Sequence, residues 1–215
     1  MAMETRSRLW RRRYYDLFSR FYDRFIELHA RKDESGTRSF LVESAGLENI
    51  EKQRVLDVCC GTGAVLLAFA GRNPRGNFFG CDFSRGMLLA ARQKDPVGNA
   101  FFIQGNAARL PFSDNSFHAV SCSHALYELK GEDRVKALYE MKRVVRNDGV
   151  VLIMEHEVPT QPLAEFMFRL RLLAMGSDDA REFVESGLKP FQKVFPTVTL
   201  RRSPSGKSKL ICCHK

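Results

Sequence analysis

Hydrophobic residues in the middle of the chain fall into short continuous runs, separated by stretches with helical spacing. Continuous runs of this kind are typical of strands that are covered on both faces. Helical stretches between them indicate the α/β class, with a mostly parallel sheet and helices on both faces. The predicted strands are 55–59, 77–81, 100–103, 117–121 and 150–154, and the predicted helices are 64–71, 85–94 and 132–145.

The two ends of the chain have different patterns. Residues 1–50 read as helical, with aromatic residues at helical spacings and arginines between them, and residues 160–186 read as one or two helices. The last stretch alternates and turns at Ser-Pro-Ser-Gly, which predicts a closing antiparallel hairpin. We therefore expect a helical lid or substrate-side segment at 1–50, and a ligand-binding domain at 51–215. The N-terminal aromatic residues are Trp10, Tyr14, Tyr15, Phe18, Phe21, Tyr22 and Phe25.

Charge is concentrated at the ends. The chain has 215 residues and a net charge of +9: residues 1–20 contribute +4, residues 189–215 contribute +7, and residues 21–188 contribute −2. Basic ends of this kind can face phosphate groups on a membrane or nucleic acid, or can simply be solvated, and the sequence leaves this open. No apolar run approaches 18 residues, and the first residues lack the pattern of a secretory signal.

The six cysteines do not form a recognisable site. They lie at 59, 60, 81, 122, 212 and 213, which is neither a zinc-binding spacing nor a disulfide framework. We expect them to be small buried side chains in a protein of the reducing cytoplasm, with no metal.

The stretch "VLDVCCGTG" (55–63) follows the first predicted strand and raises the question of its ligand. A nucleoside triphosphate loop would need Lys-Ser/Thr after Gly63, where the chain has Ala-Val. A dinucleotide loop would need a small residue where Leu66 stands, and Asp57 would repel a pyrophosphate. S-adenosylmethionine carries an ammonium and a sulfonium but no phosphate, so Asp57 and a close-approaching glycine turn suit it.

Residues after the next strands extend this hypothesis. Asp82 ends the second predicted strand, where a carboxylate can accept hydrogen bonds from both hydroxyls of a ribose. Asn106 follows the third strand and can read an adenine edge, while Phe83 and Met87 can enclose the ring. Each residue also has a structural explanation, since Asp82 can cap the following helix and the two apolar side chains can belong to the core.

Four motifs in order resemble those of class I S-adenosylmethionine-dependent methyltransferases: "VLDVCCGTG", "GCDFSRGML", "GNAARLPFSDNSFHAV" and "MKRVVRNDGVVLIMEHE". The resemblance is closest to the subgroup with the ubiquinone/menaquinone-biosynthesis C-methyltransferases. It implies a Rossmann-like, mostly parallel seven-stranded sheet with a C-terminal antiparallel hairpin, and S-adenosyl-L-methionine as cofactor. The cofactor-binding residues it implies are Asp57, Cys59, Gly61, Gly63, Asp82, Phe83, Met87, Asn106, Ala107 and Ser123.

Three positions depart from the family pattern. Cys59 stands where the family often has its first glycine, which narrows the turn slightly. Ala64 stands where the quinone enzymes commonly have an acid. Asn106 replaces a frequent aspartate and can still accept a hydrogen bond from the adenine amino group, without the charge. None of these departures removes the expectation of cofactor binding.

The methyl acceptor should lie opposite the cofactor. We expect its wall to come from "SCSHALYEL" (121–129), from Glu155 and His156, and from the N-terminal helix. His124 is the candidate for binding or deprotonating an acceptor, although it can equally be a histidine bonded to a neighbouring loop. Tyr22 is a second candidate, because its N-terminal Tyr-Asp pair resembles a family feature that covers the cofactor, and ordinary helix packing explains it equally well.

The sequence therefore predicts a methyltransferase acting on a small or lipid-like acceptor, such as a quinone ring or a phospholipid amine. The basic N-terminal helix leaves open a peripheral contact with an anionic membrane. An RNA methyltransferase is an alternative, disfavoured because no RNA-binding module and no Asn/Asp-Pro-Pro-Tyr motif is visible. A non-catalytic, regulatory S-adenosylmethionine-binding protein is another. The sequence does not indicate the oligomeric state.

Overall fold

A computed structural model describes residues 12–17, 19, 33–95, 97–129, 131–157, 182–183 and 186–215 of the chain. The candidate Tyr22 lies outside the described residues, and so do residues 160–181 of the stretch 160–186, which we expect to form one or two helices. Among the helices of the described ranges, none combines the length and apolar character needed to cross a bilayer.

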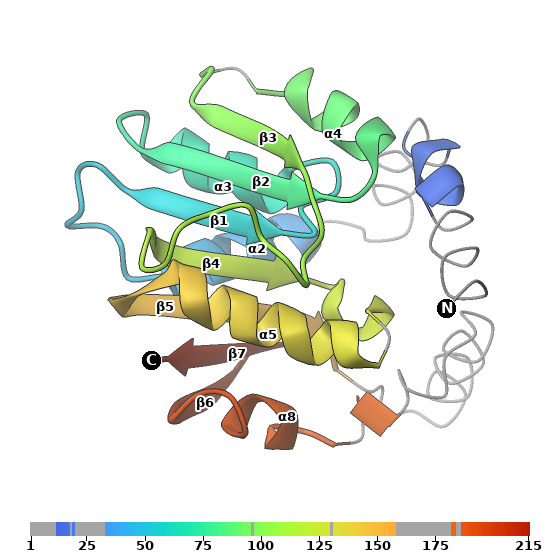
Figure 1. Cartoon of the computed structure of the whole chain (residues 1–215). Coiled ribbons are helices and arrows are strands. Elements are labelled where there is room, and N and C mark those ends of the chain that lie inside the picture. The colour runs from blue at the N-terminus through green and yellow to red at the C-terminus, as the bar shows by residue number, and fades with distance from the viewer. Residues whose placement is uncertain are drawn as a thin grey trace.

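The core of the molecule is a seven-stranded sheet with strand order β3-β2-β1-β4-β5-β7-β6 (Figure 1). β1 pairs in parallel with both β2 and β4, and only β7 runs antiparallel to its neighbours β5 and β6. The predicted mostly parallel sheet with a closing hairpin is thus confirmed. The strands are β1 (Arg54–Val58), β2 (Asn77–Asp82), β3 (Ala100–Gln104), β4 (Phe117–Ser123), β5 (Val145–His156), β6 (Thr197–Arg202) and β7 (Ser208–His214).

Helices cover both faces of this sheet because the central strands β1, β4 and β5 are buried on both sides. One face packs against α2 (Asp33–Glu43), α3 (Ala64–Arg72) and α4 (Arg85–Arg92), through residues such as Leu41, Leu66 and Leu88. The opposite face packs against α5 (Glu132–Val144) and α8 (Lys189–Gln192), through residues such as Leu138 and Phe191. The three predicted helices match α3, α4 and α5 within two residues at either end.

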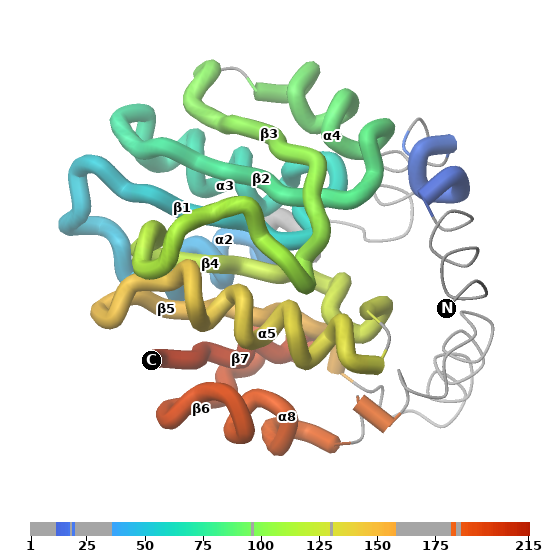
Figure 2. The backbone as a smooth tube through the Cα atoms, in the orientation of Figure 1, coloured from blue at the N-terminus to red at the C-terminus, as the bar shows by residue number. Residues whose placement is uncertain are grey.

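The course of the backbone locates a functional edge. In Figure 2 the chain steps outwards from β1 to β3 and then returns to β4 on the other side of β1, so the strand order reverses between β1 and β4. The carboxyl ends of the parallel strands meet at one edge, and ligands of such sheets bind there at the reversal point. The helical segment 12–17 lies at the same edge (Figure 1).

Two local features differ from the predicted pattern. β5 begins at Val145, directly after α5, rather than at 150, because Val145 pairs with Phe117 across a register shift before Ala119 pairs with Val150. A short 3-10 helix, η1 (Leu126–Glu128), follows β4 where the sequence indicated only a loop. Residues 146–148 are polar, so the start of β5 does not belong to a continuous apolar run, and the hydrophobic pattern alone does not reveal it.

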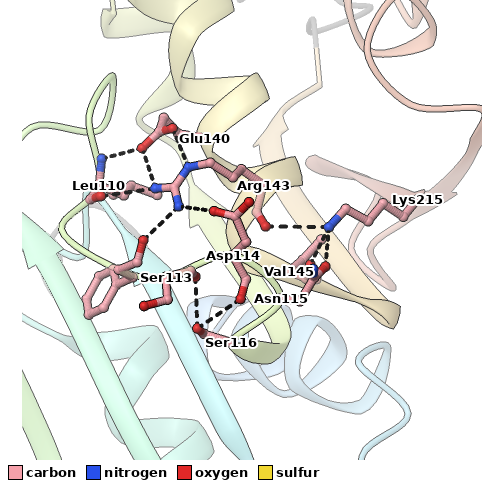
Figure 3. A network of polar contacts seen from close by, with 10 residues as sticks. Leu110, Ser113, Asp114, Asn115, Ser116, Glu140, Arg143, Val145 and Lys215 are labelled. Carbon is pink, nitrogen blue, oxygen red and sulfur yellow. Dashed lines mark hydrogen bonds and ion pairs between the residues drawn. The ribbon is translucent and has the colours of Figure 1, made fainter.

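Arg143 ties the long loop after β3 to α5 (Figure 3). Its guanidinium donates to the carbonyl oxygens of Phe112 at 2.7 Å and Leu110 at 3.1 Å. It also forms ion pairs with Asp114 and Glu140, and Glu140 accepts from the Leu110 N–H at 2.6 Å. This loop carries Asn106 and Ala107, so the network holds part of the expected cofactor site in place.

We predict that Arg143→Ala lowers the free energy of unfolding by about 2–3 kcal/mol, because several loop acceptors lose a charged donor together. Urea unfolding followed by circular dichroism measures this loss. Arg146→Ala is the control, since Arg146 pairs with Asp148 at the surface and should cost at most about 0.5 kcal/mol. Equal losses in the two variants would contradict the prediction.

Candidate active site

The loop between β1 and α3 has the backbone of a glycine turn. Gly61 and Gly63 have φ values of 52° and 79°, and Cys59 has a φ of 56° despite its side chain. A Cβ at Gly63 would lie 3.0 Å from Phe102, whereas a Cβ at Gly61 would meet nothing within 4 Å. Gly63 is therefore needed for conformation and helix packing, while Gly61 leaves open space in which a ligand can approach the backbone. That open space is compatible with the expectation that the methionine part of S-adenosylmethionine lies beside Gly61.

Asp82, at the end of β2, is bonded to this loop. Its Oδ2 accepts from the Gly61 N–H at 2.9 Å and its Oδ1 accepts from the Ser84 N–H at 2.8 Å. Burial raises the pKa of Asp82, and the N–H groups of Ser84 and Gly61 oppose this rise. The Phe83 N–H also faces this carboxylate, which has about four acceptor positions, so capacity for a ribose hydroxyl remains. Asp82 thus both positions the loop and has capacity for a ligand.

Asp57 is the second buried acid of the site. It is 2% exposed, and its Oδ1 accepts from the Ser121 hydroxyl at 2.7 Å. Burial raises the pKa of Asp57 to about 7; the Ser121 hydrogen bond opposes this shift, and the charge of Asp82 adds to it. A carboxyl group that is costly to ionise in the free protein is well matched to a cationic ligand, which removes that cost.

The residues expected around the adenine come from two loops. Phe83 is 38% exposed beside Asp82, whereas Met87 is buried in the first turn of α4. Asn106 is exposed after β3, and its Oδ1 accepts from the Ala108 N–H at 3.0 Å, while Ala107 is buried. Phe83 and Asn106 therefore present surface at this edge, and Met87 mainly supports α4.

On the β4–β5 side, two imidazole rings are stacked. The rings of His124 and His156 lie 4.1 Å apart with an interplanar angle of 23°, and the Tyr127 ring is 6.3 Å from His156. His124 follows Ser123 at the end of β4, has a φ of 52°, and donates its backbone N–H to the Met154 carbonyl at 2.7 Å. The structure thus brings together the two strand ends that the sequence assigned to the acceptor wall.

The N-terminal segment contacts this edge through residues that the sequence analysis did not select. Asp16 Oδ1 accepts from the Ser84 hydroxyl at 2.6 Å and from the Gly86 N–H at 2.8 Å. Tyr15 donates its hydroxyl to Glu128 Oε2 at 2.5 Å, and its ring lies edge-on to Phe83 at 5.7 Å. The sequence contains two Tyr-Asp pairs, at 15–16 and at 22–23, and the expectation of a cofactor cover was placed on the second. The first pair carried the same signal.

All six cysteines are free thiols. Contact with Cys122 and burial raise the pKa of the Cys59 thiol well above its usual range, and burial raises the pKa of Cys81 to about 12. In the ranges that the structure describes, no group of three or more His, Cys, Asp or Glu side chains is arranged to hold a metal ion. The thiols are therefore protonated packing groups.

Comparison with known proteins agrees with this geometry. A methyltransferase domain family matches residues 55–149. Demethylmenaquinone methyltransferase from Geobacillus kaustophilus is 37% identical over 158 residues, and the match covers 69% of this chain and 67% of the relative. The Staphylococcus aureus (strain JH9) enzyme of the same name is 33% identical, and the match covers 74% of this chain and 65% of the relative. The chain thus spans about two thirds of the length of these relatives. A TehB-like S-adenosylmethionine-dependent methyltransferase structure from Corynebacterium glutamicum superposes with a TM-score of 0.60 at 16% identity, covering 93% of this chain and 98% of that chain.

We predict that cofactor affinity rises between about pH 5.5 and 7, because an ammonium group favours the ionised form of Asp57 and binding releases its proton. Asp57→Asn should weaken binding about 10- to 100-fold, the range expected for a charged hydrogen bond, and should remove this pH dependence. Calorimetry with S-adenosylmethionine measures both effects, and Asp148→Asn, on an exposed acid, is the control.

The same variant should be more stable than the wild type at pH 8. The raised pKa of Asp57 means that its stabilising contribution is complete below pH 4 and is lost as the pH rises to about 7. The advantage of Asp57→Asn should therefore shrink as the pH falls from 7 to 4. A wild-type affinity that does not change with pH would contradict the role given to Asp57.

Proposed function

The chain belongs to the class I S-adenosylmethionine-dependent methyltransferases, near the group of the demethylmenaquinone methyltransferases, and we propose that it methylates a quinone-type acceptor. The observation that carries this choice of acceptor is the stacked pair of His124 and His156 beside the cofactor loop. Flat imidazole rings can pack against a quinone ring and hydrogen-bond to its oxygen atoms. The demethylmenaquinone acceptor named for the relatives has such a ring.

The residues that would hold the cofactor follow from the site geometry. Asp57 would face the ammonium group, the backbone at Gly61 would face the methionine part, and Asp82 would accept from the ribose. Phe83 and Asn106 would border the adenine. When bound, S-adenosylmethionine supplies an electrophilic methyl group, so the protein has chiefly to align the acceptor and exclude water.

On the acceptor side, His124 would bind an acceptor hydroxyl and take up its proton. The neighbouring ring of His156 restricts the orientation of the His124 ring, and the backbone bond to Met154 anchors the His124 main chain. A histidine so placed can act as a general base near neutral pH. These roles are consistent with the position of His124 directly after β4, at the point where strand order reverses.

The helical segment 12–17 would act as a lid over the cofactor. Tyr15 reaches Phe83 after β2 and Glu128 after β4, and β1 with its glycine loop lies between these two strands. The exposed side chains of Arg12 and Arg13 belong to the same segment. We propose that these arginines face an anionic membrane surface, from which a lipid-like quinone would be taken.

A methyl-transfer assay tests the acceptor. With methyl-labelled cofactor we expect label to pass to reduced demethylmenaquinone carried in anionic vesicles, and not to phosphatidylethanolamine in the same vesicles or to total RNA. Transfer to RNA or to the phospholipid amine would overturn the quinone proposal. Tight cofactor binding without transfer to any of the three would favour a regulatory protein.

A second test concerns the lid. A Cβ at Gly86 would lie 2.7 Å from the Asp16 carbonyl oxygen and 2.8 Å from Ser19 Oγ, so Gly86→Ala should displace the segment. We expect faster tryptic cleavage at Arg12 and Arg13 and a lower turnover number, with the fold retained because alanine favours the helix.

Gly71→Ala is the matched control for this test. Gly71 also lies in a helix, and a Cβ there meets nothing within 4 Å. This variant should leave both the cleavage rate and the turnover number unchanged. If Gly86→Ala shows normal turnover despite faster cleavage at the arginines, the lid assignment is wrong.

A further inference from the structure

A buried arginine and a buried acid lie against the backbone of η1. Arg134, in α5, donates from Nε to the Leu126 carbonyl at 3.2 Å and from Nη2 to the Tyr127 carbonyl at 3.1 Å. Glu155, at the end of β5, faces the N–H groups of Leu126 and Tyr127, which lower the pKa of its carboxyl, and its buried Oε1 has no hydrogen-bond partner among the described residues. The turn is thus held by a cation through its carbonyl oxygens, and an acid lies against its N–H groups.

Both side chains are shielded from water. Arg134 is 8% exposed and lies over the Phe183 ring at 4.4 Å, and Glu155 is 4% exposed opposite its strand partner Lys209. Burial raises the pKa of Glu155 to about 8, against the lowering effects of Lys209 and the two N–H groups. Burying a guanidinium and a carboxyl group is costly, and apolar residues of similar size would often be at least as stabilising. Their use at this turn therefore points to a need for a defined backbone position.

The residues on and next to this turn are those of the acceptor side. His124 lies two residues before Leu126, and Tyr127 belongs to η1 and packs near His156. Glu128 ends η1 and accepts from Tyr15 of the lid. A shift of the turn would move the acceptor wall and the lid contact together, while the β1 and β2 loops would stay in place.

We propose that Arg134 and Glu155 are positioning residues for the methyl acceptor, acting by fixing η1 so that His124, Tyr127 and Glu128 face it. This inference rests on the proposed function, because it assumes that the β4–β5 side binds the acceptor. A side chain that positions the reacting partner affects the reaction even when it touches neither substrate nor cofactor.

The main test replaces Arg134. Arg134→Ala should raise the KM for reduced demethylmenaquinone about tenfold or more, because two buried carbonyls lose their donor, while the cofactor Kd stays within about twofold. Arg134→Lys should recover only part of this loss, since an ammonium cannot reproduce the fork that reaches both carbonyls.

Met141→Ala is the control. Met141 is fully buried in the same helix, so this variant should lower the melting temperature without changing the acceptor KM. Equal KM changes in Arg134→Ala and Met141→Ala would overturn the proposal.

Variants of Glu155 give a second test of the proposal, which does not depend on whether the Arg134 variants fold. Glu155→Gln keeps an acceptor oxygen and should leave the acceptor KM near the wild-type value, whereas Glu155→Ala should raise it. An unchanged KM in Glu155→Ala would count against a positioning role.

Amide hydrogen exchange separates this inference from the proposed function. Peptides that cover residues 124–129 should exchange faster in Arg134→Ala and at the wild-type rate in Met141→Ala, whether or not the quinol is the acceptor. If the wild type does not methylate the quinol, the proposed function fails. If exchange over 124–129 is the same in both variants, Arg134 does not fix the turn.

Discussion

The carboxyl edge of the sheet depends on the hydrogen bonds that Asp82 accepts from Gly61 and Ser84. These bonds join the loop after β1 to the loop after β2, so the glycine turn and the start of α4 form one unit. Ser84 in turn caps α4 by accepting from the Met87 N–H, and its hydroxyl donates to Asp16. One buried carboxylate thus connects the cofactor loop, a helix N-terminus and the N-terminal segment. A loss of Asp82 would affect all three.

Three buried acids surround this edge, and burial raises the pKa of each. Asp57 and Asp82 lie on the cofactor side, and Glu155 lies under the acceptor turn. Within the part of the chain that the structure describes, the two aspartates are compensated by hydroxyl and N–H donors rather than by an ion pair, so they keep capacity for a positive ligand. The acceptor side is organised differently, because Glu155 has Lys209 opposite it and Arg134 holds the same turn. The two halves of the site are therefore held by separate sets of contacts.

The loop after β3 illustrates how the scaffold supports the site from a distance. Arg143 and Glu140 lie in α5, on the face of the sheet away from α4, and hold the loop that carries Asn106 (Figure 3). α5 also supplies Arg134 to the acceptor turn. A single helix thus contributes to both halves of the site without contacting either expected ligand.

The sequence by itself determined the sheet, its parallel strands, and the strand ends and loops that carry Asp57, Gly61, Asp82, Asn106 and His124. It could do so because burial on both faces requires continuous apolar runs, and the glycine turn is a local property of a few neighbouring residues. It did not single out Arg134, which reads as part of a solvated helix in "GEDRVKAL", nor did it distinguish Tyr15 and Asp16 from the similar pair at Tyr22. It also missed η1 and the first residues of β5. These depend on contacts between residues far apart in the chain, such as Tyr15 with Glu128 and Val145 with Phe117. Only the tertiary structure decides which polar side chains are buried and what they bond, because local sequence carries no information about the partner that folding brings beside them.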